Sequence, residues 1–385
     1  MARKLNTLLV LLPLVFSCLP FVCPLSLNYP AVFNFGDSNS DTGGLVAGKG
    51  FRLGLPFGQT FFKSASGRFC DGRLIIDFLM DAMNLPFLNP ILDSVGAPDF
   101  QNGCNFATGG ATIRPANAAA QSPFSFNIQV AQFIRFKARA LEFLSQDTEL
   151  EEYLPTEEIF SQALYMFDVG QNDLDSAFYS KSEDEVIALI PTLLSAFAYG
   201  IENLYSQGAR NFWIHNTGPL GCLPRIINPY RKDSSKLDQF GCVASHNRAV
   251  NLFNMKLHDL CINLRQELPE ANVTYVDIYS IKINLIANYS QYGFEQPIAA
   301  SCGYGGSPLN FDSRIACGVT KNLNGSTVTA NPCDNPAVYV NWDGNHYTEA
   351  ANLFVFQQIL SGNYSEPPPP ANQTPFLAGL EVKSC

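Results

Sequence analysis

A serine, an aspartate and a histidine near opposite ends of the chain have the chemistry of a nucleophilic centre. Ser38 follows a short apolar run, whereas Asp343 and His346 share the segment Trp-Asp-Gly-Asn-His. A serine hydroxyl becomes a good nucleophile when a base takes its proton, and a histidine oriented by a carboxylate is the usual base. The spacing lets Asp343 accept a hydrogen bond from Nδ1 of His346, which leaves Nε2 free to act on Ser38. We therefore predict acyl transfer, with Ser38 as nucleophile, His346 as base and Asp343 as the orienting acid.

Two further loops offer donors for the oxyanion that such an attack creates. The glycine pair that ends at Gly110 can bring a backbone N–H close to a ligand, and Asn172 supplies an uncharged side-chain amide. The N–H of Ser38 can face the same developing charge. Loss of one such donor typically lowers the rate by about a hundred- to a thousand-fold. We predict an oxyanion hole made by Ser38, Gly110 and Asn172.

Each of these segments also has an ordinary structural interpretation. Gly-Asp-Ser is most often only a turn, and glycine pairs and Asn-Asp turns are common in loops. Asp343 could cap the helix predicted over residues 349–360, with His346 in its first turn. The remaining histidines are less suited to be the base. His258 lies in a helical stretch without a nearby acid, His215 follows an apolar strand, and His246 is at the start of a polar helix face.

Apolar runs of strand length alternate along the chain with longer stretches of helical spacing. This alternation is typical of a parallel sheet covered by helices on both faces. Strands are predicted over residues 31–35, 104–107, 163–169, 211–215 and 273–276, and helices over 74–83, 128–143, 185–205, 243–268 and 349–360. The turns after the first three strands hold Ser38, Gly110 and Asn172. Because ligands bind beyond the carboxyl ends of the strands in doubly wound sheets, we expect these three residues to converge.

Four ordered segments resemble the signature blocks of the plant GDSL lipase/esterase family, a branch of the SGNH hydrolases. They are Phe33–Gly43, Asn105–Thr112, Gly170–Asp173 and Asp343–His346, and the likeness extends from about residue 31 to residue 360. The resemblance implies an α/β fold, a three-layer α/β/α sandwich with a five-stranded parallel sheet in a flavodoxin-like arrangement. It also implies that Ser38 is the nucleophile, that Gly110 and Asn172 join its N–H in the oxyanion hole, and that Asp343 orients the base His346.

Two residues depart from the family's common pattern and bear on the substrate. Asn39 replaces the leucine of the family name, and Tyr347 stands where proline is frequent. Both departures are similar to a subgroup of early-nodulin-like proteins, acetylesterases and members labelled α-L-fucosidase. The resemblance therefore implies an ester hydrolase, with a glycosidase as an alternative that would need two carboxylates about 5 to 10 Å apart. The candidate carboxylates for that alternative are Asp37, Asp173 and Asp343.

The N-terminal residues predict export from the cell. Arg3 and Lys4 precede an apolar run over residues 8–16, which is the pattern of a secretory signal peptide. We expect a signal peptide over residues 1–25, one hydrolase domain over 26–365, a proline-rich tail over 366–385 and a secreted, extracellular product. An uncleaved membrane anchor is the alternative, although prolines interrupt the run. No later segment is expected to span a membrane.

Sequons and cysteines agree with a secreted chain. Five Asn-X-Ser/Thr sequons in its C-terminal third are predicted to carry glycans, at Asn272, Asn288, Asn324, Asn363 and Asn372. The chain has eleven cysteines, and loss of the two in the leader leaves an odd number, so at least one thiol is free or paired between chains. We expect Cys222 to pair with Cys242, and Cys302, Cys317 and Cys333 to share at least one disulfide.

The charge and the missing motifs exclude several classes of function. The formal net charge is −10, which repels phosphate backbones, so no nucleic acid partner is expected. No His-Glu-X-X-His motif, Cys-X-X-Cys pair or phosphate-binding loop occurs, so neither a metal nor a nucleotide cofactor is predicted. The expected ligand is an ester, either a small molecule, a lipid or an acylated carbohydrate. A secreted binding or defence glycoprotein that has kept the scaffold without the reaction is a further alternative.

Overall fold

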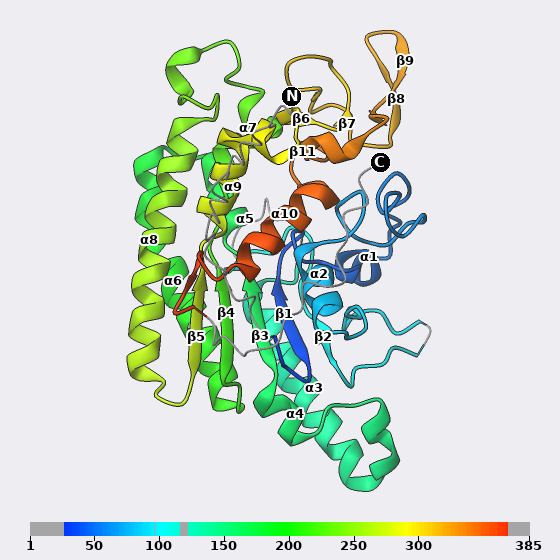
Figure 1. The fold of residues 1–385 in the computed structure, drawn as a ribbon, viewed down its shortest axis with the longest axis vertical. Helices are drawn as coiled ribbons and strands as arrows, with labels where there is room; N and C mark the ends of the chain where they lie inside the picture. The colour runs from blue at the N-terminus through cyan, green and yellow to red at the C-terminus, as the bar shows by residue number, and fades with distance from the viewer. Residues whose placement is uncertain (1–26, 96, 116–121, 369–385) are drawn as a thin grey trace, which may run out of the picture.

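A parallel β-sheet forms the centre of the protein (Figure 1). The computed structural model describes residues 27–95, 97–115 and 122–368, so the predicted signal peptide and nearly all of the predicted tail lie outside the described residues. The central strands are β1 (Val32–Gly36), β2 (Gly103–Asn105), β3 (Leu164–Asp168), β4 (Asn211–His215) and β5 (Asn272–Val276). A short sixth strand, β12 (Ser365–Glu366), pairs antiparallel with β5. The predicted five-stranded parallel sheet is thus confirmed, and an antiparallel edge strand extends it.

The order of the strands explains where the site lies. The sheet runs β12-β5-β4-β3-β1-β2, so β1 lies between β2 and β3 and pairs in parallel with both. The chain reverses its direction of travel across the sheet at this point, and in doubly wound sheets ligands bind at the carboxyl ends beside such a reversal. The loops after β1, β2 and β3 therefore come together at one edge of the sheet.

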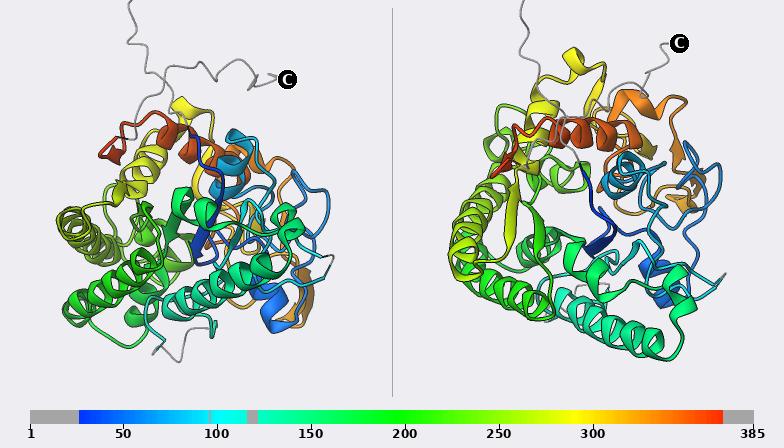
Figure 2. Two further views of the ribbon diagram at one scale, coloured as in Figure 1. Left: turned by 90° about the horizontal axis from the view of Figure 1, so that it is seen from below. Right: turned by 60° about the horizontal axis from the view of Figure 1, so that its bottom comes forward.

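Helices cover both faces of the sheet, as a three-layer sandwich requires (Figure 2). The helices are α1 (Gly44–Lys49), α2 (Ile75–Ala82), α3 (Phe126–Gln146), α4 (Glu157–Gln162), α5 (Gln171–Phe178), α6 (Glu183–Ser206), α7 (Pro224–Ile227), α8 (Ala244–Glu267), α9 (Ile278–Ala287) and α10 (Glu349–Leu360). Helices α3, α6 and α8 pack on one face, whereas α2 and α10 pack on the other.

Alternate side chains of each strand belong to the two cores on the opposite faces of the sheet. In β1, Phe33 and Phe35 face α3 and α6, whereas Val32 faces α2 and α10. The ring of Phe35 stacks between those of Phe106 and Phe167, with centroids 5.0 and 5.2 Å away. Because both faces are buried, the strands are apolar on both sides, which is why they were recognisable in the sequence.

A layer of short strands and loops lies above the carboxyl edge of the sheet. It contains three small two-stranded pairs formed by β6 (Gln296–Ala300) with β11 (Tyr339–Asn341), β7 (Cys302–Gly303) with β10 (Asn331–Pro332), and β8 (Thr320–Leu323) with β9 (Ser326–Thr329). The sequence did not predict these pairs, because their strands have only two to five residues each. The β8–β9 hairpin projects from the body of the protein (Figure 1).

One helix corrects an expectation about membrane spans. Among the described residues, α6 has the length and apolar composition that could cross a membrane, whereas no such segment was expected after the leader. In the fold, its buried residues belong to the core that also contains side chains of α3 and α8. The helix begins with the acidic residues Glu183, Asp184 and Glu185 after the capping residue Ser182.

Both expected disulfides are confirmed. Cys222 pairs with Cys242, and Cys302 pairs with Cys317. Cys333 is not part of a disulfide among the described residues, and its Sγ lies 2.9 Å from Oγ of Ser301.

The predicted glycosylation sites differ in exposure. Asn272, Asn324 and Asn363 are exposed, and Asn324 lies at the tip of the β8–β9 hairpin. Asn288 is partly buried at the end of α9, where its side chain donates to Asn284. Asn372 lies outside the described residues. The exposed sequons are accessible to modification. Glycosylation at these sites stays a prediction.

Buried His215 is expected to make folding sensitive to acid. Neither ring nitrogen of His215 has a hydrogen-bond partner within the described part of the chain, and burial lowers its pKa to about 3. The unfolded chain binds a proton at this residue below about pH 6.5, so stability is full above that pH and falls as the pH is lowered toward 3. Between pH 7 and pH 5, this group should cost the folded state about 2 kcal/mol.

Urea unfolding of the wild-type protein and His215→Leu at pH 7 and pH 5 measures this effect. The free energy of unfolding of the wild type should fall more steeply with acid than that of the variant. Parallel losses in the two proteins would show that His215 is not the responsible group.

Candidate active site

Ser38 lies in a tight turn directly after β1. The N–H of Asp37 donates to the carbonyl of Asp168 at 3.1 Å, and the N–H of Ser40 donates to the carbonyl of Asp37 at 3.2 Å. Just before the turn, the side chain of Gln129 accepts from the N–H of Gly36 at 2.9 Å and donates to its carbonyl at 2.8 Å. These bonds fix both sides of the turn, so the position of the Ser38 hydroxyl is set by backbone contacts.

The structure brings His346 and Asp343 to Ser38. Nε2 of His346 lies 2.8 Å from Oγ of Ser38, and Nδ1 lies 2.7 Å from Oδ2 of Asp343. Oδ1 of Asp343 accepts from the backbone N–H groups of Asn345 and His346, both at 2.9 Å. This is the geometry in which a carboxylate orients an imidazole and the imidazole accepts a hydroxyl proton.

The loop that carries His346 is a turn, and a separate residue caps the helix after it. Thr348 caps α10, since its Oγ1 accepts from the N–H of Ala351 at 3.2 Å. The alternative in which Asp343 caps this helix is therefore wrong. Gly344 has φ of +100°, and a Cβ there would come within 2.3 Å of the Phe311 ring, so only glycine fits this turn.

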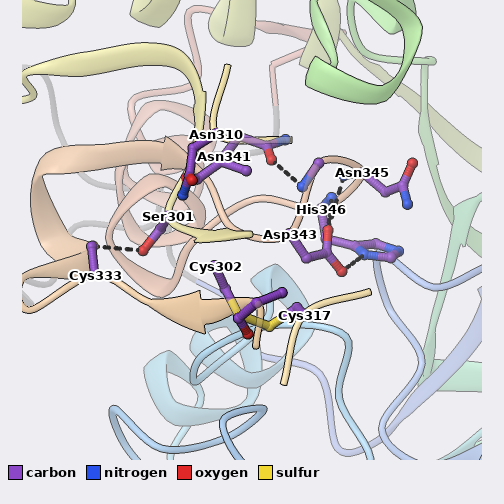
Figure 3. Close-up of a disulfide and its surroundings, with 12 residues drawn as sticks. Ser301, Cys302, Asn310, Cys317, Cys333, Asn341, Asp343, Asn345 and His346 are labelled. Carbon is purple, nitrogen blue, oxygen red and sulfur yellow. Dashed lines mark hydrogen bonds and ion pairs between the residues drawn. A yellow bond between two sulfur atoms is a disulfide. The ribbon is translucent and has the colours of Figure 1, made fainter. Parts of the chain in front are cut away.

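A disulfide lies next to this turn (Figure 3). Cys302 is bonded to Cys317, and its backbone N–H donates to the carbonyl of Trp342 at 2.6 Å. The side-chain oxygen of Asn341 accepts from the N–H of Gly344 at 2.6 Å. The segment leading into Asp343 is thus bound to a cross-linked part of the chain, which limits the movement of the imidazole.

The environment of Asp343 favours its charged form. The carboxyl group is buried, and burial alone would raise its pKa, but the charge of His346 and the hydrogen bonds from His346 and Asn345 outweigh that effect. The pKa of Asp343 therefore lies below its usual range. An ionised Asp343 holds Nδ1 of His346 protonated, which leaves the lone pair of Nε2 directed at Ser38.

The three predicted oxyanion donors meet beside Ser38. Ser38, Gly110 and Asn172 line one cleft together with His346. Among the described residues, the backbone N–H groups of Ser38 and Gly110 have no hydrogen-bond acceptor. Asn172 lies in the first turn of α5, where its Nδ2 donates to Oδ2 of Asp37 at 3.1 Å and to the carbonyl of Ala111 at 3.0 Å. The cleft therefore holds two free backbone donors and one oriented amide.

Asp41 joins the serine loop to the glycine loop. Its carboxylate accepts from the N–H groups of Gly43 at 2.7 Å, Gly44 at 2.5 Å and Leu45 at 3.1 Å, and also from Gly109 at 2.7 Å. Burial raises the pKa of Asp41 to about 6, although these donors oppose the rise. Asp41 was not identified from the sequence. Its position three residues after Ser38 in an acidic, glycine-rich turn was the available signal.

Buried ionisable groups lie next to Asn172, the predicted oxyanion donor. Burial and the neighbouring Asp168 raise the pKa of Asp37 well above its usual range. Burial lowers the pKa of Lys282 to about 8, against the opposing charges of Asp168 and Asp37. The two residues that depart from the common family pattern both contact these buried ionisable side chains. Asn39 donates to Asp37 at 3.0 Å, and the Tyr347 ring lies 3.8 Å from the Lys282 ammonium.

The cleft around Ser38 has a volume of about 780 Å³ and a lining of mixed character. Its apolar lining residues include Leu53, Phe57, Phe69, Ile315 and Val319. Its polar lining residues include four from α5 and α7, which are Gln171, Asp175, Ser176 and Arg225. The ring of Phe69 packs 5.3 Å from that of His346, so this imidazole lies against an apolar side chain of the cleft.

The remaining candidate carboxylates do not face this cleft. Asp173 is buried, accepts from the N–H of Ile113 at 2.7 Å, and has a pKa raised by burial to about 7. Asp37 is buried as well and is used by Asn39 and Asn172. Over the described ranges, no three His, Cys, Asp or Glu side chains cluster so that they could hold a metal ion.

Comparisons with known proteins identify the family of the chain. The sequence model of the GDSL-like lipase/acylhydrolase family matches residues 32–359. The chain is 56% identical to a GDSL esterase/lipase of Arabidopsis thaliana, covering 93% of this chain and 94% of that protein. A second Arabidopsis thaliana GDSL esterase/lipase is 55% identical and covers 89% and 90%, and the protein named alpha-L-fucosidase 3 from the same plant is 44% identical and covers 87% and 91%. The chain therefore belongs to the GDSL-like lipase/acylhydrolase family and is an ester-hydrolysing enzyme.

Proposed function

We propose that this enzyme is a secreted serine esterase that cleaves carboxylic esters through an acyl-enzyme on Ser38, within a hydrolase domain over residues 26–365. One observation carries the proposal. Nε2 of His346 lies 2.8 Å from Oγ of Ser38 although the two residues are 308 positions apart in the chain. No local structural requirement explains such a contact, and it lies in the cleft where two free N–H groups and Asn172 also meet.

The first half of the reaction forms the acyl-enzyme. Oγ of Ser38 attacks the ester carbonyl carbon while Nε2 of His346 takes the hydroxyl proton. The carbonyl oxygen becomes an oxyanion, which accepts from the N–H groups of Ser38 and Gly110. It also accepts from Nδ2 of Asn172, which gives up one of its two bonds, to Asp37 or to the carbonyl of Ala111, to make this one. When this intermediate collapses, the bond to the alcohol oxygen breaks and His346 gives its proton to that oxygen.

The second half regenerates the enzyme with water. A water molecule attacks the acyl carbon through its oxygen while His346 takes one of its protons. The oxyanion forms in the same place as before. The bond to Oγ of Ser38 then breaks, Oγ regains its proton from His346, and the carboxylic acid leaves. Asp343 stays ionised and stabilises the imidazolium in both halves, in keeping with its lowered pKa.

The mixed lining of the cleft supports an ester that has both apolar and polar parts. The apolar lining residues suit an acyl chain, and the polar ones suit an alcohol that forms hydrogen bonds, as in a lipid or an acylated carbohydrate. Export is supported by the predicted leader, by exposed sequons and by two disulfides, since disulfides persist mainly outside the cytosol.

Glycoside hydrolysis is a second candidate because a relative is named an alpha-L-fucosidase. The reaction needs two carboxyl groups that face one sugar. Of the carboxylates that line the cleft, Asp343 is bonded to His346 and Asp175 is paired with Arg225 at 2.6 Å. Neither is free to act as an acid or a nucleophile, so the contacts favour ester hydrolysis.

Turnover of p-nitrophenyl butyrate compared with p-nitrophenyl fucoside distinguishes these candidates. We expect the purified protein to release p-nitrophenol from the ester and not from the fucoside. Fucoside turnover that survives Ser38→Ala would overturn the proposal, as would the absence of any ester turnover. The second result would leave a binding glycoprotein as the better interpretation.

Replacement of Asn172 by alanine is expected to lower kcat about 10²- to 10³-fold, because one oxyanion donor is lost. The KM should change little, since the donor acts on the charge that develops in the transition state. Steady-state kinetics with p-nitrophenyl butyrate measure both constants.

Asn251→Ala is the matched control for this variant. The exposed amide of Asn251 also donates one hydrogen bond, to the Tyr279 hydroxyl at 3.1 Å, but it lies on α8 outside the cleft. Its kcat should stay at the wild-type value. An Asn172→Ala enzyme within threefold of wild type would remove Asn172 from the oxyanion hole.

A further inference from the structure

Arg225 links two parts of the proposed active site that come from distant segments of the chain. On one side, its Nη2 donates to Oδ2 of Asp175 at 2.6 Å and its Nη1 donates to the Tyr179 hydroxyl at 2.5 Å. On the other side, its Nε donates to the side-chain oxygen of Asn345, and its backbone N–H donates to the carbonyl of Gly344 at 3.1 Å. A single residue therefore binds α5 and the turn between Asp343 and His346.

Both segments that Arg225 binds carry groups that the proposed reaction uses. Asp175 lies on α5 one turn after Asn172, so the guanidinium holds the helix that presents the oxyanion donor. Gly344 and Asn345 separate Asp343 from His346, so the same guanidinium holds the turn that presents the base. Arg225 thus connects the turn that carries the proposed base to the helix that carries the proposed oxyanion donor.

Arg225 connects the turn to α5, whereas the Phe311 ring and the disulfide-linked segment hold the turn through other contacts. The Phe311 ring lies against Gly344 so closely that a Cβ would come within 2.3 Å, which restricts the turn on that side. The Asp175 carboxylate is about one-tenth exposed and the Arg225 guanidinium about one-quarter exposed, so their ion pair is partly shielded from water. Pairs of this kind are stronger and more directional than surface pairs.

We propose that Arg225 is a positioning residue that sets the place of His346 relative to Asn172 and takes no part in the proton transfers. This inference rests on the proposed esterase function of the same site. A planar guanidinium donates in several fixed directions at once, whereas a lysine ammonium is a single point charge on a flexible chain. The role therefore requires the shape of arginine as well as its charge.

Arg225→Met and Arg225→Lys test the inference with p-nitrophenyl butyrate. Both variants should lose about 10- to 100-fold in kcat, since a displacement of about 1 Å in a catalytic constellation costs up to about 10²-fold. Their KM values should stay within about threefold of wild type, because Arg225 is not expected to contact the substrate. Asp175→Asn should lower kcat in the same direction, and Arg225→Met with Asp175→Asn should be little worse than Arg225→Met alone.

Arg248→Met is the matched control. Arg248 on α8 forms a bidentate pair with Glu183 on α6, at 2.7 and 2.6 Å, and it lies outside the cleft. This variant should keep the wild-type kcat. The rate at which a fluorophosphonate labels Ser38 gives a second readout that does not depend on turnover, and it should fall in both Arg225 variants and not in the control.

Three results would overturn the inference while the proposed function stands. They are a wild-type kcat in Arg225→Met, full restoration of kcat in Arg225→Lys, and a raised KM at unchanged kcat, which would indicate a substrate contact instead. A wild-type protein that neither hydrolyses the ester nor reacts with the fluorophosphonate would overturn the proposed function, and this inference with it.

Discussion

Ser38→Ala is expected to lower kcat/KM for p-nitrophenyl butyrate by at least about four orders of magnitude. The variant loses the only atom that can form the acyl-enzyme in this mechanism, while the oxyanion donors remain. Any residual rate should come from those donors acting on direct attack by water. The hydroxyl lies at the edge of the cleft and is partly exposed, so the free energy of unfolding should change by less than about 1 kcal/mol.

Ser40→Ala is the matched control for this prediction. Ser40 lies in the same turn, but its buried Oγ has no hydrogen-bond partner in the described part of the chain. Steady-state kinetics should place Ser40→Ala within about threefold of wild type, which is the scale of ordinary surface or loop perturbation. A Ser38→Ala enzyme that keeps more than a tenth of the wild-type activity would exclude Ser38 as the nucleophile.

Asp343→Asn is expected to lower kcat by about 10⁴-fold with the fold intact. The carboxylate accepts from Nδ1 of His346 at 2.7 Å, and an amide that presents its NH₂ group there would favour the other tautomer. Nε2 would then carry the proton and could not accept one from Ser38. The surroundings of Asp343 lower its pKa and so favour its ionised form, which asparagine cannot supply.

The kinetics of Asp343→Asn are to be compared with those of Asp259→Asn. Asp259 lies on α8 outside the cleft and pairs with Lys256 at 3.2 Å, so its replacement should leave kcat unchanged. Circular dichroism should show the same secondary structure for both variants. If Asp343→Asn lost less than about tenfold in kcat, the proposed orientation of His346 by this carboxylate would be contradicted.

The central sheet could be predicted because its strands are buried on both faces. The predicted run over residues 211–215 coincides with β4, and the predicted run over residues 31–35 lies within one residue of β1. The convergence of Ser38, Gly110 and Asn172 followed from their places after the first three parallel strands. The link to Asp343 and His346 came from residue chemistry and from the family resemblance, because no local pattern indicates a contact across 308 positions.

Other features could not be predicted, because they depend on contacts between distant segments. Helix α5 was missed because its first turn is polar, although Leu174 and Ala177 have helical spacing. Asp41 and Arg225 act through bonds to loops that are remote in the sequence, and the sequence around each residue does not show which distant group its side chain will meet. Helix α6 looks apolar enough for a membrane because it is a core helix of a large sheet protein.

Reaction with a fluorophosphonate, followed by peptide mass mapping, tests the central claim most directly. Only a serine whose proton is taken by a base reacts at a useful rate, so the proximity of Ser38 to His346 predicts a single adduct on the peptide that contains Ser38. The adduct should be absent from the His346→Ala protein under the same conditions. An unlabelled wild-type protein, an adduct on another serine, or equal labelling of Ser38 without His346 would contradict the account.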